Sequence, residues 1–142
     1  MFSRILIAND GSDGALRAFE TALDLASALG SYIHMISVEA DLPRYVEEET
    51  LEEVQEEKSR EDTYFGKLAR HAHGMASLRG VTLEHSVVSG HEVKSIVEFA
   101  RSGRFNLLVI GYHGHSKLYD HLWGGTSQNL TRLSPCSVLV VK

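Results

Sequence analysis

The sequence contains little of what marks secreted or membrane proteins. Its 142 residues include one cysteine and two prolines, and no apolar run approaches the ~20 residues that cross a bilayer. The single cysteine, Cys136, cannot form an internal disulfide, which argues against a small secreted scaffold and fits a reducing compartment. The N-terminal segment MFSRILIAND has too short an apolar stretch for a signal peptide, because charge follows at once. We therefore expect a cytoplasmic protein without a membrane segment.

The chain also has no excess of positive charge. Its 14 basic and 19 acidic side chains give a net charge of −5, so the molecule as a whole repels nucleic acid and anionic membranes, and we expect neither as a partner. A small anionic ligand would have to bind through local dipoles. Hydrophobic residues make up 43% of the chain, which is enough for one core, and the length predicts a single domain over residues 1–142.

Apolar, β-branched runs alternate along the chain with segments of helical periodicity. The runs predict strands over Arg4–Asp10, Ser31–Val38, Val81–Gly90, Asn106–Ile110 and Cys136–Lys142. Apolar residues at helical spacing predict the helices between them, around Ala15–Ala26, Phe65–Ala76, Val93–Ala100 and Leu130–Leu133. This order predicts an α/β fold with a mostly parallel sheet and helices on both faces. Ligands of such sheets bind outside the carboxyl ends of the strands, where the strand order reverses.

An acidic run between Glu47 and Glu57 precedes the second predicted helix. We interpret it as a solvated helix start or a mobile loop, in preference to a docking surface for a basic protein partner.

A glycine-rich segment, GYHGHSKLYDHLWGGTS, follows the fourth predicted strand and runs from Gly111 to Ser127. Glycines let a backbone approach an anion closely, and successive amide groups can surround it. Residues Gly124–Ser127 fall where the last helix should begin, and a helix N-terminus attracts phosphate. The alternative is that the glycines only form turns and that Thr126 or Ser127 caps the helix.

The familiar phosphate-binding motifs are missing. The sequence has no G-x-x-x-x-G-K-[ST], and no G-x-G-x-x-G follows the first predicted strand. Phosphate contacts would therefore come from amides and hydroxyls. A metal on His113, His115 and His121 is a weaker hypothesis, because their spacing has no defined ligand geometry. A catalytic serine is weaker still, since the G-x-S-x-G turn is missing.

Asp10 ends the first predicted strand and faces two interpretations. Its carboxylate could accept hydrogen bonds from ribose hydroxyls or an adenine amino group. It could also cap the next helix or start a turn with Gly11. The residue taken alone slightly favours this structural role.

Several segments together resemble the universal stress proteins. The similarity rests on ILIANDGSDGALRAFETALDLA, NLLVIGYHG, the spaced glycines and the closing CSVLVVK, and it covers nearly the whole chain. In the ATP-binding branch of that family the pattern is Gly, two residues, Gly, nine residues, Gly, then Ser or Thr. Gly111, Gly114 and Gly124 keep this spacing.

The resemblance implies a three-layer α/β/α sandwich, Rossmann-like, with a five-stranded parallel sheet in the order 3-2-1-4-5 and ATP, with or without Mg²⁺, over strands one and four. Residues implied at the nucleoside end are Ala8, Asn9, Asp10, Val38, Ile110 and Gly111. Those implied at the phosphates are His113, Gly114, His115, Gly124, Gly125, Thr126 and Ser127.

Two positions depart from the family pattern. Gly125 stands where the family has Ser or Thr, and the loss of one neutral hydrogen bond should weaken ATP binding by roughly tenfold at most. Asn106 stands where the family often has aspartate, which should matter for the start of the strand and not for the ligand.

The resemblance implies a cytoplasmic stress-response protein that binds ATP and acts as a nucleotide-dependent switch or chaperone-like factor on an unknown protein partner. The closing strand is apolar and lies at an edge in the implied order, so we expect a homodimer through Cys136–Val141. The alternative is a family member without nucleotide binding that works as a protein-interaction module. At most slow ATP hydrolysis or autophosphorylation is expected, because no residue is an evident general base.

Overall fold

The chain folds into a parallel sheet flanked by helices. The computed structural model describes residues 1–39, 51–112 and 125–142, with side chains from residue 64 onward in the second range. The strands are β1 (Arg4–Ala8), β2 (Tyr32–Glu39), β3 (Leu83–Ser89), β4 (Leu107–Gly111) and β5 (Ser137–Val141). All of their pairings are parallel, and their order is β3-β2-β1-β4-β5. The predicted fold class and strand order are therefore confirmed.

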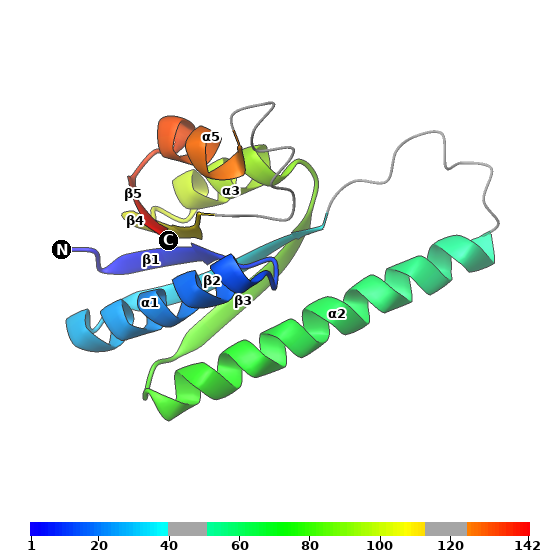
Figure 1. The fold of residues 1–142 in the computed structure, drawn as a ribbon, viewed down its shortest axis with the longest axis horizontal. Helices are drawn as coiled ribbons and strands as arrows, with labels where there is room; N and C mark the ends of the chain where they lie inside the picture. Colours follow the sequence, from blue (N-terminus) through cyan, green and yellow to red (C-terminus); the bar gives the residue numbers. More distant parts are fainter. Residues whose placement is uncertain (40–50, 113–124) are drawn as a thin grey trace.

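Helices cover both faces of the sheet. They are α1 (Asp13–Leu29), α2 (Leu51–Leu78), α3 (Glu92–Ser102) and α5 (Thr126–Leu133). Figure 1 shows α1 and α2 on one face and α3 and α5 on the other, which makes three layers. It also shows the N-terminal end of α2 extending past the sheet. None of the described helices combines the length and the apolar character that a membrane span requires.

Alternation along the central strand divides the core in two. Ile5 and Ile7 of β1 pack into the cluster under α1 and α2, whereas Leu6 packs into the cluster under α3 and α5. All three side chains are fully buried. A strand that is apolar on both faces is what a doubly covered parallel sheet requires.

Helix α1 begins and ends as the residue types indicate. Ser12 is the N-cap, and its hydroxyl accepts a hydrogen bond from the amide of Ala15. Gly30 ends the helix in the left-handed region with φ of 66°, where glycine has no steric penalty. Small residues such as Ala18 and Ala22 are fully buried, so α1 approaches the sheet closely.

Several predicted boundaries shift by one or two residues. The first strand ends at Ala8, so Asp10 lies in the turn that follows and not at the strand end. The acidic run is helical from Leu51 onward, as one of its interpretations held, and residues 47–50 lie outside the described ranges. Asn106 supports the start of β4: its Oδ1 atom accepts from the Arg4 amide at 3.0 Å, as expected for a structural position.

Candidate functional site

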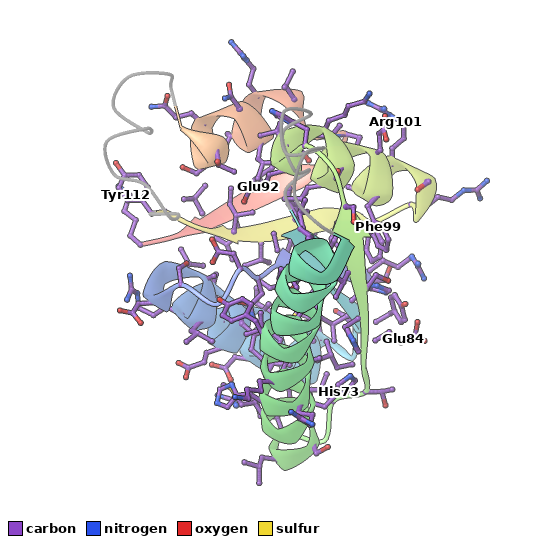
Figure 2. All side chains as sticks on the ribbon, turned by 90° about the vertical axis from the view of Figure 1, so that its right-hand side faces the viewer. His73, Glu84, Glu92, Phe99, Arg101 and Tyr112 are labelled. Atoms are coloured by element: carbon purple, nitrogen blue, oxygen red, sulfur yellow. The ribbon has the colours of Figure 1, made fainter. Side chains whose placement is uncertain are left out.

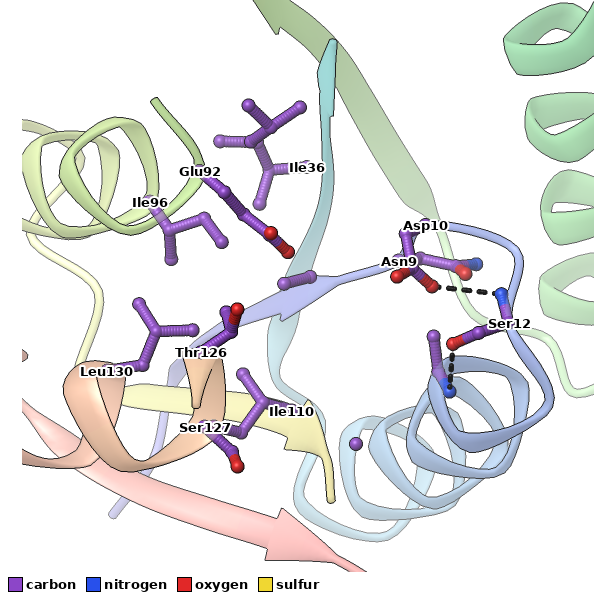
Figure 3. A pocket seen from close by; sticks show the side chains of 14 residues that line it. Asn9, Asp10, Ser12, Ile36, Glu92, Ile96, Ile110, Thr126, Ser127 and Leu130 are labelled. Atoms are coloured by element: carbon purple, nitrogen blue, oxygen red, sulfur yellow. Dashed lines mark hydrogen bonds between the residues drawn. The ribbon is translucent and has the colours of Figure 1, made fainter. Parts of the chain in front are cut away.

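A cleft opens at the carboxyl edge of the sheet, where β1 lies between β2 and β4 and the strand order reverses (Figure 3). About 540 Å³ of space lies among its lining residues, a figure that includes open solvent. The lining residues come from the ends of three strands and the starts of three helices. They are Ala8, Asn9, Asp10, Ser12, Ala15, Ile36, Val38, Glu92, Ile96, Ile110, Gly111, Thr126, Ser127 and Leu130.

The turn after β1 is built from its own side chains. The Asn9 Oδ1 atom accepts from the Gly11 amide at 3.0 Å, and the Asp10 Oδ1 atom accepts from the Ser12 amide at 2.9 Å. Asp10 thus forms the turn that one interpretation predicted, while Ser12 takes the capping role. Asp10 also lines the cleft, so its turn and a ligand contact are compatible: a carboxylate has more than one acceptor site.

Asn9 joins this turn to the neighbouring strand. Its side chain is 2% exposed, and its amide nitrogen donates to the sulfur of Met35 at 3.4 Å. Its backbone amide donates to the Ile36 carbonyl at 3.0 Å, and its carbonyl accepts from the Ser37 hydroxyl at 2.7 Å. These three hydrogen bonds hold the end of β1 against β2 at the cleft.

Gly111 ends β4 directly against the first turn of α1. A side chain there would clash with the backbone of Gly14, so the close approach of helix and strand requires glycine. This packing reason exists whether or not a ligand approaches the same residue.

Helix α5 begins at the cleft with a glycine as its N-cap. This residue, Gly125, has φ of 53° and ψ of 154° and provides no side-chain hydrogen bond to cap the helix. Thr126 and Ser127 already belong to the helix, so the alternative in which one of them caps it is wrong. The Ser127 hydroxyl instead donates to the Tyr112 carbonyl at 3.3 Å. The first amides of a helix have no partner within it, and the helix dipole makes them attractive to an anion.

Most of the implied site residues lie together. The structure brings eight of them into one cleft: Ala8, Asn9, Asp10, Val38, Ile110, Gly111, Thr126 and Ser127. Gly125 immediately precedes Thr126 at the helix start. His113, Gly114, His115 and Gly124 lie outside the described residues, as does His121 of the metal hypothesis. Among the residues that are described, no group of three potential metal ligands occurs.

Residue-level reasoning missed Glu92 and Ser12. Glu92 is the first residue of α3 and lines the cleft opposite the turn after β1 (Figure 3). The signal was available, because every helix that follows a parallel strand starts at the carboxyl edge. The described lining contains two carboxylates, Asp10 and Glu92, and no lysine or arginine. A phosphate would therefore depend on helix amides and hydroxyls there.

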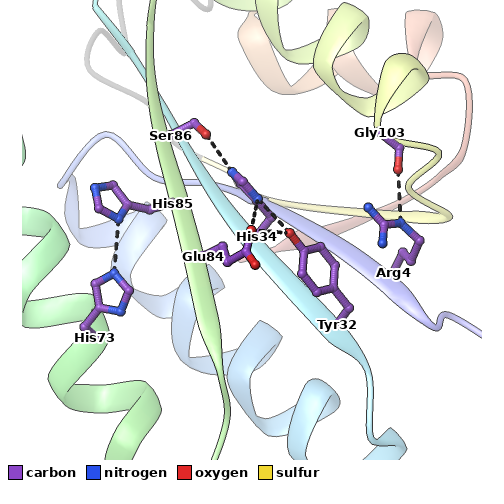
Figure 4. Close-up of polar contacts among 8 residues, drawn as sticks. All are labelled: Arg4, Tyr32, His34, His73, Glu84, His85, Ser86 and Gly103. Atoms are coloured by element: carbon purple, nitrogen blue, oxygen red, sulfur yellow. Dashed lines mark hydrogen bonds and ion pairs between the residues drawn. The ribbon is translucent and has the colours of Figure 1, made fainter.

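A second cluster of polar side chains lies on the neighbouring strands β2 and β3 (Figure 4). The Nε2 atom of His34 lies 2.9 Å from the Ser86 hydroxyl, and its Nδ1 atom lies 3.1 Å from the Tyr32 hydroxyl. Burial lowers the pKa of His34, although the Glu84 carboxylate 3.9 Å away acts in the opposite direction. Nearby, the Nε2 atom of His73 on α2 lies 3.1 Å from the Nδ1 atom of His85 on β3. None of these residues lines the cleft.

Comparison with known proteins identifies the family. The profile of the universal stress protein family matches residues 1–142. The chain belongs to the universal stress protein family. Universal stress protein YxiE of Bacillus subtilis is 29% identical over 151 residues, with both chains covered in full.

Solved universal stress proteins share the fold. UspA from Lactobacillus plantarum superimposes with a TM-score of 0.86 at 20% identity, covering 99% of this chain and 98% of that one. A universal stress protein crystallised in complex with cAMP has a TM-score of 0.77 at 27% identity, covering 99% of this chain and 97% of that one. This universal stress protein therefore has the architecture that its residues predicted.

Figure 2 shows the side chains of the described residues, with Glu92 between the sheet and the helices above it and Tyr112 beside the end of β4. The cleft of this universal stress protein is lined by Glu92 and by the turn after β1, at the edge where β4 ends and α5 begins.

Proposed function

We propose that this universal stress protein binds an adenine nucleotide, ATP, in the cleft and acts as a nucleotide-dependent switch or chaperone-like factor in the cytoplasm. The observation that carries the proposal is the convergence of eight implied ligand residues, from five separate elements or turns, on one cleft. The family relative crystallised with cAMP supports the same ligand class.

The chemistry of the lining fits the two ends of a nucleotide. Val38 is partly buried, and the buried Ile36, Ile96 and Ile110 make this part of the lining apolar, which suits a flat base. Asp10 offers a carboxylate acceptor for ribose hydroxyls or an adenine amino group. The start of α5 offers amides and the hydroxyls of Thr126 and Ser127 for phosphate oxygens.

The Asp10 carboxylate, which we propose contacts the nucleotide, distinguishes this site from a purely apolar cleft. Asp10 is therefore the residue to change. Asp10→Ala should weaken ATP binding by ~1.5–3 kcal/mol, the contribution of a hydrogen bond to a charged group. The matched control is Asp13→Ala: Asp13 is exposed, is three residues away, and does not line the cleft. Calorimetric titration with ATP, ADP, AMP and cAMP measures both, and native mass spectrometry of fresh protein reports copurified nucleotide.

Two outcomes would contradict the proposal. One is wild-type protein that shows no heat with millimolar ATP and magnesium and carries no copurified nucleotide. The other is Asp10→Ala protein that binds as tightly as wild type, which would place the ligand elsewhere.

The second candidate is a protein-interaction module without nucleotide binding. Gly125 favours it, because the hydroxyl that the family pattern has at this position is missing. The first of the two contradicting outcomes would establish it.

A further inference from the structure

Helix α2 contacts the Asp10 turn from outside the cleft. The hydroxyl of Tyr64, a residue of α2, donates a hydrogen bond to the main-chain carbonyl of Asp10. The two residues are 54 positions apart in the sequence. The helix runs beside the turn at the right-hand edge of Figure 3. The turn that carries a proposed ligand residue is therefore held by an element none of whose described side chains lines the cleft.

Gly11 shows how closely the turn and the helix fit. Its φ of 84° lies in the left-handed region, and a Cβ atom built on it would overlap the Tyr64 hydroxyl and lie 3.8 Å from the Cδ1 atom of Leu68. Any side chain at position 11 would thus displace the Tyr64 hydroxyl, and the positive φ would strain the turn. Glycine at position 11 therefore permits both the positive φ of the turn and the close contact with Tyr64.

The turn is attached to two different elements by hydrogen bonds. Asn9 fixes the turn to β2, through Met35, Ile36 and Ser37. Tyr64 fixes it to α2. Partial burial and the Asp10 charge raise the pKa of the Tyr64 hydroxyl above its ordinary value of 10.0, so it remains a donor at physiological pH.

We propose that Tyr64 is a positioning residue for the nucleotide: it holds the Asp10–Gly11 turn in its binding conformation and couples the docking of α2 to occupancy of the cleft. This inference rests on the proposed nucleotide binding at Asp10. A turn that is ordered before binding loses less conformational freedom when the ligand arrives, which favours affinity. Coupling between two equilibria is reciprocal, so a bound nucleotide must also hold α2 more firmly against the turn.

The variant Tyr64→Phe tests the hydroxyl and keeps the ring. It should weaken ATP binding by roughly two- to tenfold, the range for one neutral hydrogen bond. The matched control is Tyr32→Phe, which removes a hydroxyl that donates to Glu84 at 2.9 Å and has no contact with the turn. Tyr32→Phe should leave the affinity unchanged. Equal losses in the two variants would mean a general effect on the fold and would overturn the proposal.

The double variant separates positioning from mere stability. If Tyr64 acts through Asp10, Tyr64→Phe should have no further effect on ATP affinity in the Asp10→Ala background. Additive losses would overturn the proposal. Wild-type protein that fails to bind ATP would instead remove the nucleotide function itself.

Hydrogen exchange measures how firmly the turn and α2 are held, first without nucleotide and then with ATP. Without nucleotide, the amides of Gly11 and Ser12 should exchange faster in Tyr64→Phe than in wild type or Tyr32→Phe. With ATP, the amides of α2 around Tyr64 should exchange more slowly in wild type but not in Tyr64→Phe. Unchanged exchange of the turn in Tyr64→Phe would overturn the proposal even in a protein that binds ATP normally.

Discussion

A Cβ atom on Gly111, the last residue of β4, would lie 2.7 Å from the carbonyl carbon and oxygen of Gly14 in the first turn of α1. Backbone atoms cannot move aside as a flexible side chain can, so strand and helix meet here at the limit of van der Waals contact. Gly111 thus permits a single close crossing, at the edge of the cleft, with a helix turn nearly one hundred residues away in the sequence.

Gly111→Ala should therefore destabilise the protein. The added methyl group must separate β4 from α1, and overpacking of this kind costs ~1–3 kcal/mol. Urea unfolding measures the loss. Gly74→Ala is the control, because nothing lies within 4 Å of a Cβ atom at that helical position, and alanine should there stabilise α2 by roughly 0.5–1 kcal/mol. An unchanged midpoint for Gly111→Ala would show that the two elements separate freely.

His34 should make the stability depend on pH. Burial lowers its pKa in the folded protein below the ordinary 6.5, so the unfolded chain takes up the proton more readily. The contribution of neutral His34 to the free energy of unfolding is then complete above pH 6.5 and is lost as the pH falls through the pKa of the folded state. Urea midpoints between pH 8 and pH 5 should decline in wild type and decline less in His34→Gln. His71→Gln, which changes an exposed histidine of α2, should follow wild type, and a pH profile unaffected by His34→Gln would refute the assignment.

Gly125 can be tested by a pair of variants. Its φ of 53° and ψ of 154° are unfavourable for other residues, at a cost of ~1–3 kcal/mol. Gly125→Ser restores the hydroxyl of the family pattern but also introduces this strain, and Gly125→Ala introduces the strain alone. In ATP titrations the serine variant should bind more tightly than the alanine variant, by roughly tenfold at most. Equal affinities would mean that the hydroxyl does not reach the ligand.

The homodimer is expected to form through residues Cys136–Val141. Strand β5 ends the described sheet order and pairs with β4 along one side, and an apolar edge strand tends to pair with another copy. Sedimentation at micromolar concentration should show a species of twice the 15.7 kDa chain mass. Val140→Lys should shift it towards the monomer, whereas Leu133→Lys, at a leucine of α5 that is 49% exposed, should not. A wild-type protein that sediments only as a monomer would contradict the expectation.

The alternation of elements was sufficient to predict the parallel sheet and a cleft at its carboxyl edge. Both follow from rules that act on every parallel sheet, and the resemblance to the family supplied the strand order. Strand β3 shows a limit of such patterns, because Val87 belongs to an alternation of apolar and polar residues and yet is 42% exposed. A strand at the end of the sheet has fewer neighbours to cover it, which a pattern of residue types does not show.

The contacts that hold the cleft together could not be predicted in the same way. Asn9 reaches Met35, 26 residues away, and Tyr64 reaches Asp10 across 54 residues. Such pairs depend on where each helix packs on the sheet, and a single sequence does not give that position. Ser12 was equally well placed to cap α1 as Asp10, and only the observed hydrogen bonds distinguish the two.

The floor of the cleft is also part of the hydrophobic core. Ile36, Ile96, Ile110 and Leu130 line the cleft and belong to the cluster that joins α3 and α5 to the sheet. A base stacked on this floor would extend the core by one more apolar group. Binding should then carry the negative heat-capacity change of apolar burial. It should also raise the thermal stability of the half of the molecule that contains α3 and α5, because the bound base would pack directly on the core side chains of that half.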